Sequence, residues 1–392
     1  MKIIINSVKI LNKIEKMADE KGNHNIIIDN GSAFIKAGFS DEKEPKSVFP
    51  TCIGYPKNAG GMVEGEKIEL LVGSKAEAKC SSLKLYYPIE SGNINNWIDM
   101  EKIWGHIFTD ELKVNSGENN VILTEATDSS KEAREKMAQI MFETFNVPGL
   151  YIGLQSLLSL YTSGKTTGIV VDSGEDVTRY TPIFDGFIIS PGVIQQNLGG
   201  RHLTEYLARP HNGIIQSITS TNPTTEKNIF QVIKEKSCYV VPFDFEKELK
   251  LIKPFDYELP DGTHVIVKDQ RIKCPEILFK PSLIGKLGKG IGQTCNDSIQ
   301  KCDNDVRKDL YNSIILSGGN SMFNGLPERF TTEIKNLAPE STKKEINVIA
   351  SPERKYSVWI GGSILSSIST FKNLLIHKFE YEESGAMIVH KK

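Results

Sequence analysis

The sequence has 392 residues, of which 39% are hydrophobic and 24% charged, a balance typical of a globular protein large enough for two domains. Its formal net charge of -2 gives no electrostatic reason to expect direct binding to nucleic acid. The six cysteines lack the spacing of a zinc site or a disulfide framework, and no apolar run approaches the roughly 20 residues that span a bilayer.

Residues 1–16 differ from the rest of the chain, because lysines alternate there with apolar residues at near-helical spacing. Two hypotheses fit this pattern: a basic amphipathic helix that contacts a membrane surface or targets an organelle, and an N-terminal extension that is disordered or not translated. The tetrapeptide Met17-Ala18-Asp19-Glu20 is typical of a protein start and favours the second hypothesis.

Residues 25–49 predict a strand, a turn and two further strands. The apolar run Asn25–Asp29 leads into Gly31, and the run Gly168–Asp172 leads into Gly174 in the same way. Glycine permits a tight turn whose backbone N–H groups cradle an anion, and an Asp at the strand end suits a phosphate-bound Mg²⁺. A hairpin that binds no ligand would show the same pattern. The presence of two copies favours a nucleotide-binding hairpin that is used twice.

Between these two hairpins the sequence predicts a polar, glycine-rich loop over 55–67, followed by three helices. Apolar residues recur at helical spacing over 101–111 and 130–145, and Ser130 is positioned to cap the second of these helices. An apolar helix over 155–161 comes directly before the second hairpin.

Turn and helix signals continue in chain order after the second hairpin. They are the turns Asp185-Gly186 and Pro191-Gly192, the helix start Gly199-Gly200-Arg201, a helix over 224–239 and a hairpin turn over 257–262. Residues 312–319 then predict a strand that delivers Gly318 and Gly319 to a helix, which is a platform for an anion or nucleotide. A plain strand–helix joint fits that junction equally well.

Long segments of the chain resemble the actin family. They are Asp29-Asn30-Gly31-Ser32 with Lys36-Ala37-Gly38-Phe39, the run over 134–146, and the run over 352–365. The resemblance implies a two-domain α/β fold of the actin, sugar-kinase and heat-shock-chaperone ATPase class, with duplicated phosphate hairpins and a central nucleotide cleft. It also implies an outer domain of 17–162 plus 356–392, with subdomains 1 and 2, and an inner domain of 163–355, with subdomains 3 and 4.

The resemblance further implies ATP and Mg²⁺ as cofactors, with Ca²⁺ as another possible ion. Asp29, Gln155 and Asp172 would hold the hydrated metal ion, and Gln155 would orient the attacking water beside Asp172 and Arg179. The implied phosphate-binding residues are Gly31, Ser32, Ala33, Lys36, Ser173, Gly174, Glu175, Asp176 and Val177. The implied adenosine-lining residues are Gly200, Lys234, Glu235, Gly318, Gly319, Met322 and Lys355. Without the resemblance, Lys234 and Glu235 would indicate a solvated helix face, and Met322 ordinary core.

Several departures from the actin pattern lie at these turns. Ala33 takes the place of a glycine, which is a mild change if its φ is negative and an unfavourable one if its φ is positive. Asp176 also replaces a glycine, and like charges about 4 Å apart repel by roughly 4 kcal/mol near a protein surface. We expect ATP affinity to fall on the order of ten- to a thousandfold, unless Asp176 points outward or engages the metal.

Arg179 replaces a histidine that in actins is thought to help position the attacking water. Because its guanidinium stays protonated, arginine cannot act as a general base, but it stabilises charge that develops on a transferred phosphoryl group. We therefore expect ATP hydrolysis to be altered and slow. Ser91 likewise replaces a histidine of the actin pattern.

The surfaces that actins use for assembly are retained in part. The apolar loop Ser282–Gly285 corresponds to a plug between filament strands, but Lys286 follows it and would weaken burial there. The segment over 245–257 is shorter than in actins, and Asn222-Pro223 lies in an altered loop. An apolar groove for actin-binding proteins is implied at Tyr161, Ile364, Leu365, Ile368 and Leu374.

Two functions follow as hypotheses. The first is a divergent actin of the cytoplasmic cytoskeleton that binds ATP and Mg²⁺ and assembles with itself or with actin. The second is a non-polymerising, non-hydrolysing actin-related subunit that acts as a binding module in a cytoskeletal or nuclear complex. A small-molecule kinase shares the fold, but no carboxylate base for a second substrate is identifiable.

Overall fold

The computed structural model describes residues 25–57, 70–209, 223–259, 262 and 264–392. Its contacts divide the chain into two compact units. The first unit runs up to Thr166 and is completed by Tyr356–Lys392, and the second unit is Thr167–Lys355. The expectations for residues 1–16, for most of the 55–67 loop, and for Asn222 and the Pro260-Asp261 turn fall outside the described residues.

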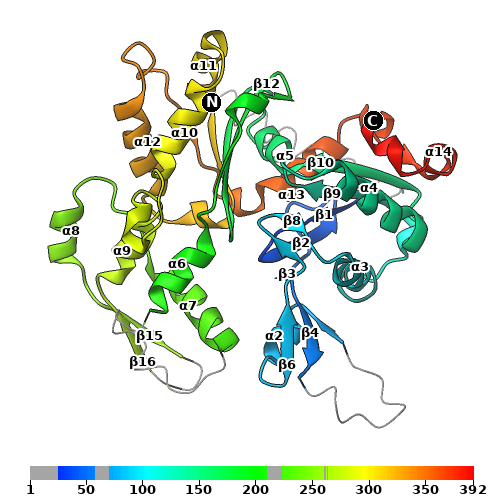
Figure 1. Cartoon of the computed structure of the whole chain (residues 1–392), viewed down its shortest axis with the longest axis horizontal. Coiled ribbons are helices and arrows are strands. Elements are labelled where there is room, and N and C mark those ends of the chain that lie inside the picture. Colours follow the sequence, from blue (N-terminus) through cyan, green and yellow to red (C-terminus); the bar gives the residue numbers. More distant parts are fainter. Residues whose placement is uncertain (1–24, 58–69, 210–222, 260–261, 263) are drawn as a thin grey trace. The chain divides into compact units, whose positions relative to one another are not determined.

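The first unit is built on a six-stranded sheet with the order β19-β10-β9-β1-β2-β3 (Figure 1). Its strands are β1 (Asn25–Asp29), β2 (Phe34–Phe39), β3 (Ser47–Pro50), β9 (Asn120–Glu125), β10 (Gly149–Leu154) and β19 (Ile376–His377). β1 pairs antiparallel with β2 and parallel with β9, which confirms the predicted strand–turn–strand at the first Asp-x-Gly site.

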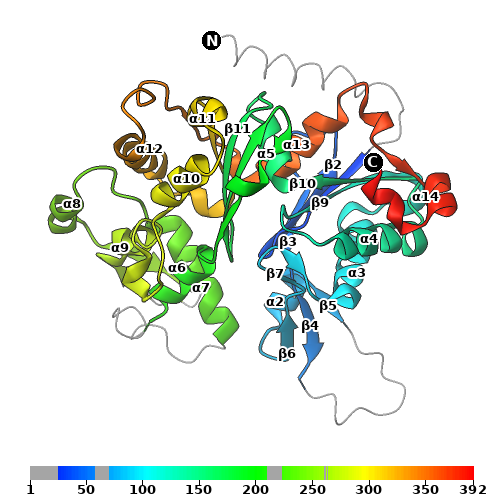
Figure 2. The ribbon, with the colours of Figure 1, turned by 45° about the horizontal axis from the view of Figure 1, so that its top comes forward.

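The apolar run in β1 is buried on both faces of this sheet. Ile26 and Ile28 belong to one core cluster and Ile27 to another, because successive side chains of a strand point to opposite faces. The first cluster contains side chains of α3 (Trp97–His106) and α4 (Lys131–Gln139). The second contains side chains of α5 (Gln155–Tyr161) and α13 (Ser357–Ser366), which lie side by side (Figure 2).

The predicted helices of the first unit are confirmed with shifted ends. Ser130 caps α4, whose Ala133 N–H donates to the Ser130 Oγ at 3.1 Å. The helix expected over 101–111 begins earlier, because the Asn96 side chain accepts a hydrogen bond from the Asp99 N–H at 3.1 Å. α3 and α4 each continue into a π-helical segment, Ile107–Leu112 and Ile140–Thr144.

The first unit also carries short strands and two further α-helices. They are β4 (Ile53–Pro56), β5 (Leu71–Val72), α2 (Ser74–Ala78), β6 (Leu83–Tyr86), β7 (Ile89–Glu90), β8 (Asn93–Ile94) and, at the C-terminal end, α14 (Lys378–Ser384). Tyr55 and Pro56 belong to β4 and not to the predicted loop, because they pair with β6.

The second unit is built on a sheet with the order β13-β12-β11-β17-β18, in which β14 also pairs with β12. Its strands are β11 (Gly168–Ser173), β12 (Thr178–Phe184), β13 (Phe187–Ile188), β14 (Ile194–Gln196), β17 (Ile314–Ser317) and β18 (Val348–Ile349). β11 pairs antiparallel with β12 and parallel with β17, so it has the same kinds of neighbours as β1. The second predicted hairpin is confirmed.

The remaining elements of the second unit include the predicted helices after Gly199 and over 224–239, together with several helices that the sequence did not predict. They are α6 (Gly200–Leu207), α7 (Pro223–Ser237), α8 (Phe245–Leu251), β15 (Phe255–Glu258), β16 (His264–Val267), α9 (Gln270–Glu276), α10 (Ile291–Gln300), α11 (Asn304–Tyr311) and α12 (Leu326–Leu337). Gly318 leads into a short 3-10 turn, Gly319–Met322, and not directly into an α-helix. The chain leaves the helical conformation at Phe323, and the α-helix starts only after its N-cap Gly325, which has a φ of 79°.

No helix in the described part of the chain is both long enough and apolar enough to cross a membrane.

Candidate functional site

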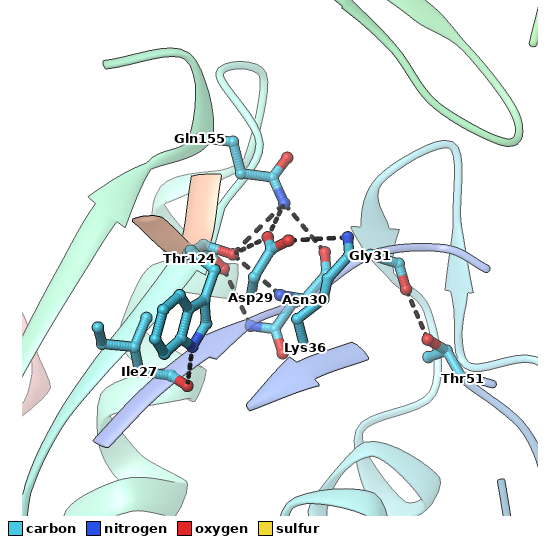
Figure 3. A network of polar contacts seen from close by, with 9 residues as sticks. Ile27, Asp29, Asn30, Gly31, Lys36, Thr51, Thr124 and Gln155 are labelled. Carbon is cyan, nitrogen blue, oxygen red and sulfur yellow. Dashed lines mark hydrogen bonds and ion pairs between the residues drawn. The ribbon is translucent and has the colours of Figure 1, made fainter. Parts of the chain in front are cut away.

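Asp29 stands at the end of β1 and is held in a fixed position by two neighbouring strands. Its Oδ2 lies 2.8 Å from Lys36 Nζ, and its Oδ1 accepts a hydrogen bond from Thr124 Oγ1 at 3.0 Å (Figure 3). Asp29 and Lys36 are cross-strand partners in the β1–β2 hairpin, and the Asp29 side chain is only 3% exposed. The carboxylate is therefore presented at the strand end with a cation beside it.

Gln155, which the resemblance assigns to the metal together with Asp29, lies beside this carboxylate. It is the first residue of α5, and its Nε2 donates to the Asn30 carbonyl oxygen at 3.0 Å and lies 3.4 Å from Asp29 Oδ1. Figure 3 shows its carbonyl oxygen on the side turned away from Asp29. The amide nitrogen thus holds the first turn, while the carbonyl oxygen faces outward from the network.

Two residues that the sequence interpretation missed complete the network around Asn30. Thr124, at the end of β9, accepts a hydrogen bond from the Asn30 N–H at 2.9 Å. Trp104 on α3 donates from Nε1 to Asn30 Oδ1 at 3.1 Å. A signal for Thr124 was present, because it follows a buried apolar run and parallel neighbouring strands end at the same edge of a sheet.

The first turn itself is closely packed around Gly31. A Cβ added to Gly31 would lie 3.2 Å from Lys36 Nζ, and the Gly31 carbonyl oxygen accepts from Thr51 Oγ1 at 2.7 Å. Ser32 Oγ accepts from the Gly92 N–H at 3.1 Å. Ala33 does not have a positive φ, so of the two expected outcomes the mild one applies.

The second hairpin repeats the register of the first. Asp172 on β11 is the cross-strand partner of Arg179 on β12, as Asp29 is of Lys36. Arg179 is 7% exposed, so its guanidinium is buried within the second unit. In both hairpins a cationic residue therefore stands across from the Asp that ends the first strand.

Ser173 and Gly318 bring the second and third glycine sites together. Ser173 Oγ contacts Thr178 Oγ1 at 2.8 Å and accepts from Asn320 Nδ2 at 3.0 Å. Gly318 has a φ of 86°, and a Cβ there would overlap the Ser173 carbonyl group and lie 2.8 Å from Asp172 Oδ1. Only glycine fits this position without displacing the Asp172 carboxylate.

The N-terminal end of α6 packs directly against the second turn. The Gly200 N–H donates to the Gly174 carbonyl oxygen at 2.9 Å, and the Arg201 N–H donates to that of Glu175 at 2.8 Å. Lys234 on α7 is 5% exposed, and its Nζ donates to the Gly200 carbonyl oxygen at 3.0 Å. Lys234 is therefore a buried residue behind the turn and not part of a solvated helix face.

His202 caps α6 through its side chain. The Gly199 N–H donates to His202 Nδ1 at 3.1 Å, which requires that nitrogen to be unprotonated. Burial and the charge of Lys286 lower the pKa of His202 from its ordinary value. The imidazole is consequently neutral at pH 7.

Asp176 does not stand as an uncompensated charge at the second turn. Its Oδ1 lies 2.7 Å from Arg201 Nη2, and its side chain is 6% exposed. The expected loss of ATP affinity assumed an acidic side chain facing a phosphate without a counter-charge. The structure instead pairs that side chain with a cation on α6.

The other predicted contact residues of the second unit are more dispersed. Val177 is buried, and its carbonyl oxygen accepts from the Gly174 N–H at 3.0 Å. Glu235 is exposed and accepts from Gln231 Nε2 at 3.2 Å, as on a solvated helix face. Met322 and Lys355 are half-buried, and Lys355 follows Arg354, whose carbonyl oxygen accepts from the Gly318 N–H.

The residues predicted to form a partner groove in the first unit separate into two groups. Leu365 is 7% exposed and belongs to the core cluster of Trp359, so it is a core residue and not part of the exposed surface. Ile368 and Leu374 are 48% and 39% exposed. Tyr161 and Ile364 are half-buried, and burial raises the pKa of Tyr161.

The described residues contain no cluster of three or more His, Cys, Asp or Glu side chains that could hold a metal ion. Each hairpin instead offers one carboxylate, Asp29 or Asp172, at a strand end. Mg²⁺ suits such an arrangement, because it is usually held by one or two carboxylates together with waters and substrate phosphates.

A comparison with protein-family models matches residues 20–392 to the family described as Actin.

Proposed function

The chain belongs to the actin family, and on that premise we propose that it binds ATP with Mg²⁺ through its two Asp-x-Gly turns, one nucleotide per chain. The observation that carries this proposal is the shared register of the two hairpins. In each, an Asp at a strand end has a cationic cross-strand partner, Lys36 or Arg179. A hairpin that only reverses the chain, and binds no ligand, would need neither the carboxylate nor the cation.

The residues present suit the proposed ligand. Asp29 and Asp172 offer hard oxygen donors, which Mg²⁺ prefers, and Lys36 offers an ammonium group for a phosphate. A side chain on Gly31 would reach Lys36 Nζ, and one on Gly318 would reach the Asp172 carboxylate. Both glycines therefore keep the cation and the carboxylate accessible.

We assign the chain's own residues distinct roles toward the nucleotide. Bound Mg²⁺ would neutralise phosphate charge, with Asp29 and Asp172 as its anchors. Lys36 would bind the terminal phosphates, and the outward-facing carbonyl oxygen of Gln155 would orient a water. We propose that hydrolysis is slow, because the arginine at position 179 cannot serve as a general base toward the attacking water.

Titration calorimetry tests the binding proposal. Wild-type protein should bind ATP in the presence of Mg²⁺, and Asp29→Asn and Asp172→Asn should each weaken that binding about tenfold or more, since each removes a hard donor. Asp185→Asn is the matched control, because Asp185 lies in the β12–β13 turn. Equal affinity in all four proteins would refute the assignment.

We further propose that the chain assembles with itself or with actin in the cytoplasmic cytoskeleton. Leu283 is 48% exposed in the loop that the resemblance assigns to assembly, and Leu287, just after that loop, is 103% exposed. Lys286 Nζ donates to the Asn197 carbonyl oxygen at 2.9 Å, so its charge is directed back onto the chain and away from these leucines. Exposed apolar side chains of this kind favour a protein contact.

The second candidate is a non-polymerising subunit that binds partners through the groove near Ile368 and Leu374. The buried Arg179 favours this second function, because slow ATP hydrolysis suits a subunit that does not assemble and disassemble with each nucleotide. Sedimentation with ATP and Mg²⁺ separates the two functions. A chain that pellets alone or with actin supports assembly, whereas one that stays in the supernatant under both conditions supports the subunit.

A further inference from the structure

The second turn carries two acidic side chains, and each has a cationic partner on a different helix. Asp176 Oδ1 lies 2.7 Å from Arg201 Nη2 on α6. Glu175 Oε1 lies 3.6 Å from Lys227 Nζ on α7. The turn therefore presents less negative charge than its sequence suggests.

These two ion pairs are of unequal strength. The Asp176 side chain is 6% exposed, and its 2.7 Å contact with Arg201 is the shorter of the two ion pairs. The Glu175–Lys227 contact is longer than a hydrogen bond, although the Glu175 side chain is only 10% exposed. A buried carboxylate needs a close counter-charge, so Asp176 depends on Arg201 more than Glu175 depends on Lys227.

Arg201 also holds the backbone of the same turn. Its N–H donates to the Glu175 carbonyl oxygen at 2.8 Å, next to the Gly200 N–H that donates to Gly174. Main chain and side chain of Arg201 thus act on adjacent residues, and together they direct the Asp176 carboxylate toward α6.

We propose that Arg201 is a positioning residue that makes the second turn compatible with an anionic ligand, a role that rests on the proposed binding of ATP. By pairing with Asp176, Arg201 removes the repulsion that this carboxylate would exert on a phosphate. The pair also explains how the turn accommodates an acidic residue where the actin pattern has glycine. Without Arg201, the Asp176 carboxylate would lose this counter-charge.

A double-mutant cycle on ATP affinity tests this role. Arg201→Gln should weaken ATP binding about tenfold or more in the wild-type background, because the Asp176 carboxylate loses the counter-charge of Arg201. In the Asp176→Asn background, the same change should weaken binding less than about threefold. Lys227→Gln is the matched control and should also cost less than about threefold, because its ion pair is longer.

Two further readouts separate charge compensation from a purely structural role. The Arg201→Gln defect should shrink as salt is added, because salt screens charge repulsion. Arg201→Lys keeps the charge and should stay within about threefold of wild-type affinity, so it tests the role even if Arg201→Gln does not fold.

The outcomes distinguish this inference from the proposed function. If wild-type protein binds ATP but Arg201→Gln has the same effect in both Asp176 backgrounds, the role of Arg201 is wrong and ATP binding stands. If Arg201→Lys loses affinity as strongly as Arg201→Gln, charge compensation is also wrong. If wild-type protein does not bind ATP, the proposed function fails together with this role.

Discussion

The replacement of Gly318 by alanine is the sharpest structural test of the second turn. Gly318 has a φ of 86° and a ψ of 156°, a region that is essentially restricted to glycine. Its new Cβ would lie 2.7 Å from the Ser173 carbonyl carbon and 2.8 Å from Asp172 Oδ1. Because one neighbour is backbone and the other is the proposed metal anchor, neither moves without disturbing the turn.

The expected loss follows from these two effects. The backbone conformation alone costs a residue with a Cβ about 1–3 kcal/mol, and overpacking adds about 1–3 kcal/mol. Gly318→Ala should therefore reduce the free energy of unfolding by about 3 kcal/mol and weaken ATP binding, since Asp172 is displaced.

Gly319→Ala provides the matched control one residue away. A Cβ on Gly319 meets no atom within 4 Å, and its φ is not positive. Its free energy of unfolding should change by less than about 1 kcal/mol. Urea denaturation of the two variants without nucleotide, followed by ATP titration, measures both effects, and equal losses in the two variants would refute the packing argument.

Three further predictions concern the first turn and the cap of α6. Lys36→Met should lower the free energy of unfolding by about 3 kcal/mol in urea denaturation, because it leaves the buried Asp29 carboxylate without its cation; a loss below about 1 kcal/mol would contradict this. Ala33→Gly should change ATP affinity less than about threefold in calorimetry, because Ala33 has no positive φ; a large gain in affinity would show that its Cβ obstructs the ligand. Since burial and Lys286 lower the pKa of His202, the unfolded chain takes up its proton first, and stability is lost as pH falls through about 6.5. The melting temperature should therefore fall less between about pH 7.5 and about pH 5.5 in His202→Gln than in wild type, and identical slopes would exclude His202 as the cause.

The hairpins were predictable because their signals are local. A β-branched run followed by Asp, a polar residue and glycine indicates both a buried strand and a tight turn, and β1 and β11 form as expected. Helix α5 was predictable because its signal is also local, an apolar segment directly before the second hairpin. The ends of α3 were harder to predict. Its N-cap is Asn96, and after the helix the chain continues as a π-helical segment.

The partners of the site residues were not predictable, because they come from distant parts of the chain. Thr124 and Trp104 reach the first turn from another strand and another helix. Arg201 reaches Asp176 only after α6 packs against the turn. The sequence therefore identified Asp176 as an unusual charge but did not show that the charge is compensated.

The interpretation of single side chains depended on packing in the same way. Leu365 matches the apolar pattern of a surface groove, yet it is buried in the core beside Trp359. Lys234 has the charge of a solvated helix residue, yet its Nζ is held by the Gly200 carbonyl oxygen and by Thr204. Residue type alone does not decide between these environments.

The most direct test of the central claim is the nucleotide content of the purified protein. Protein isolated in the presence of Mg²⁺ should release a single adenine nucleotide per chain when it is denatured, and should lose that nucleotide after treatment with a metal chelator. Protein that carries no nucleotide, and that acquires none when ATP and Mg²⁺ are added, would contradict the account.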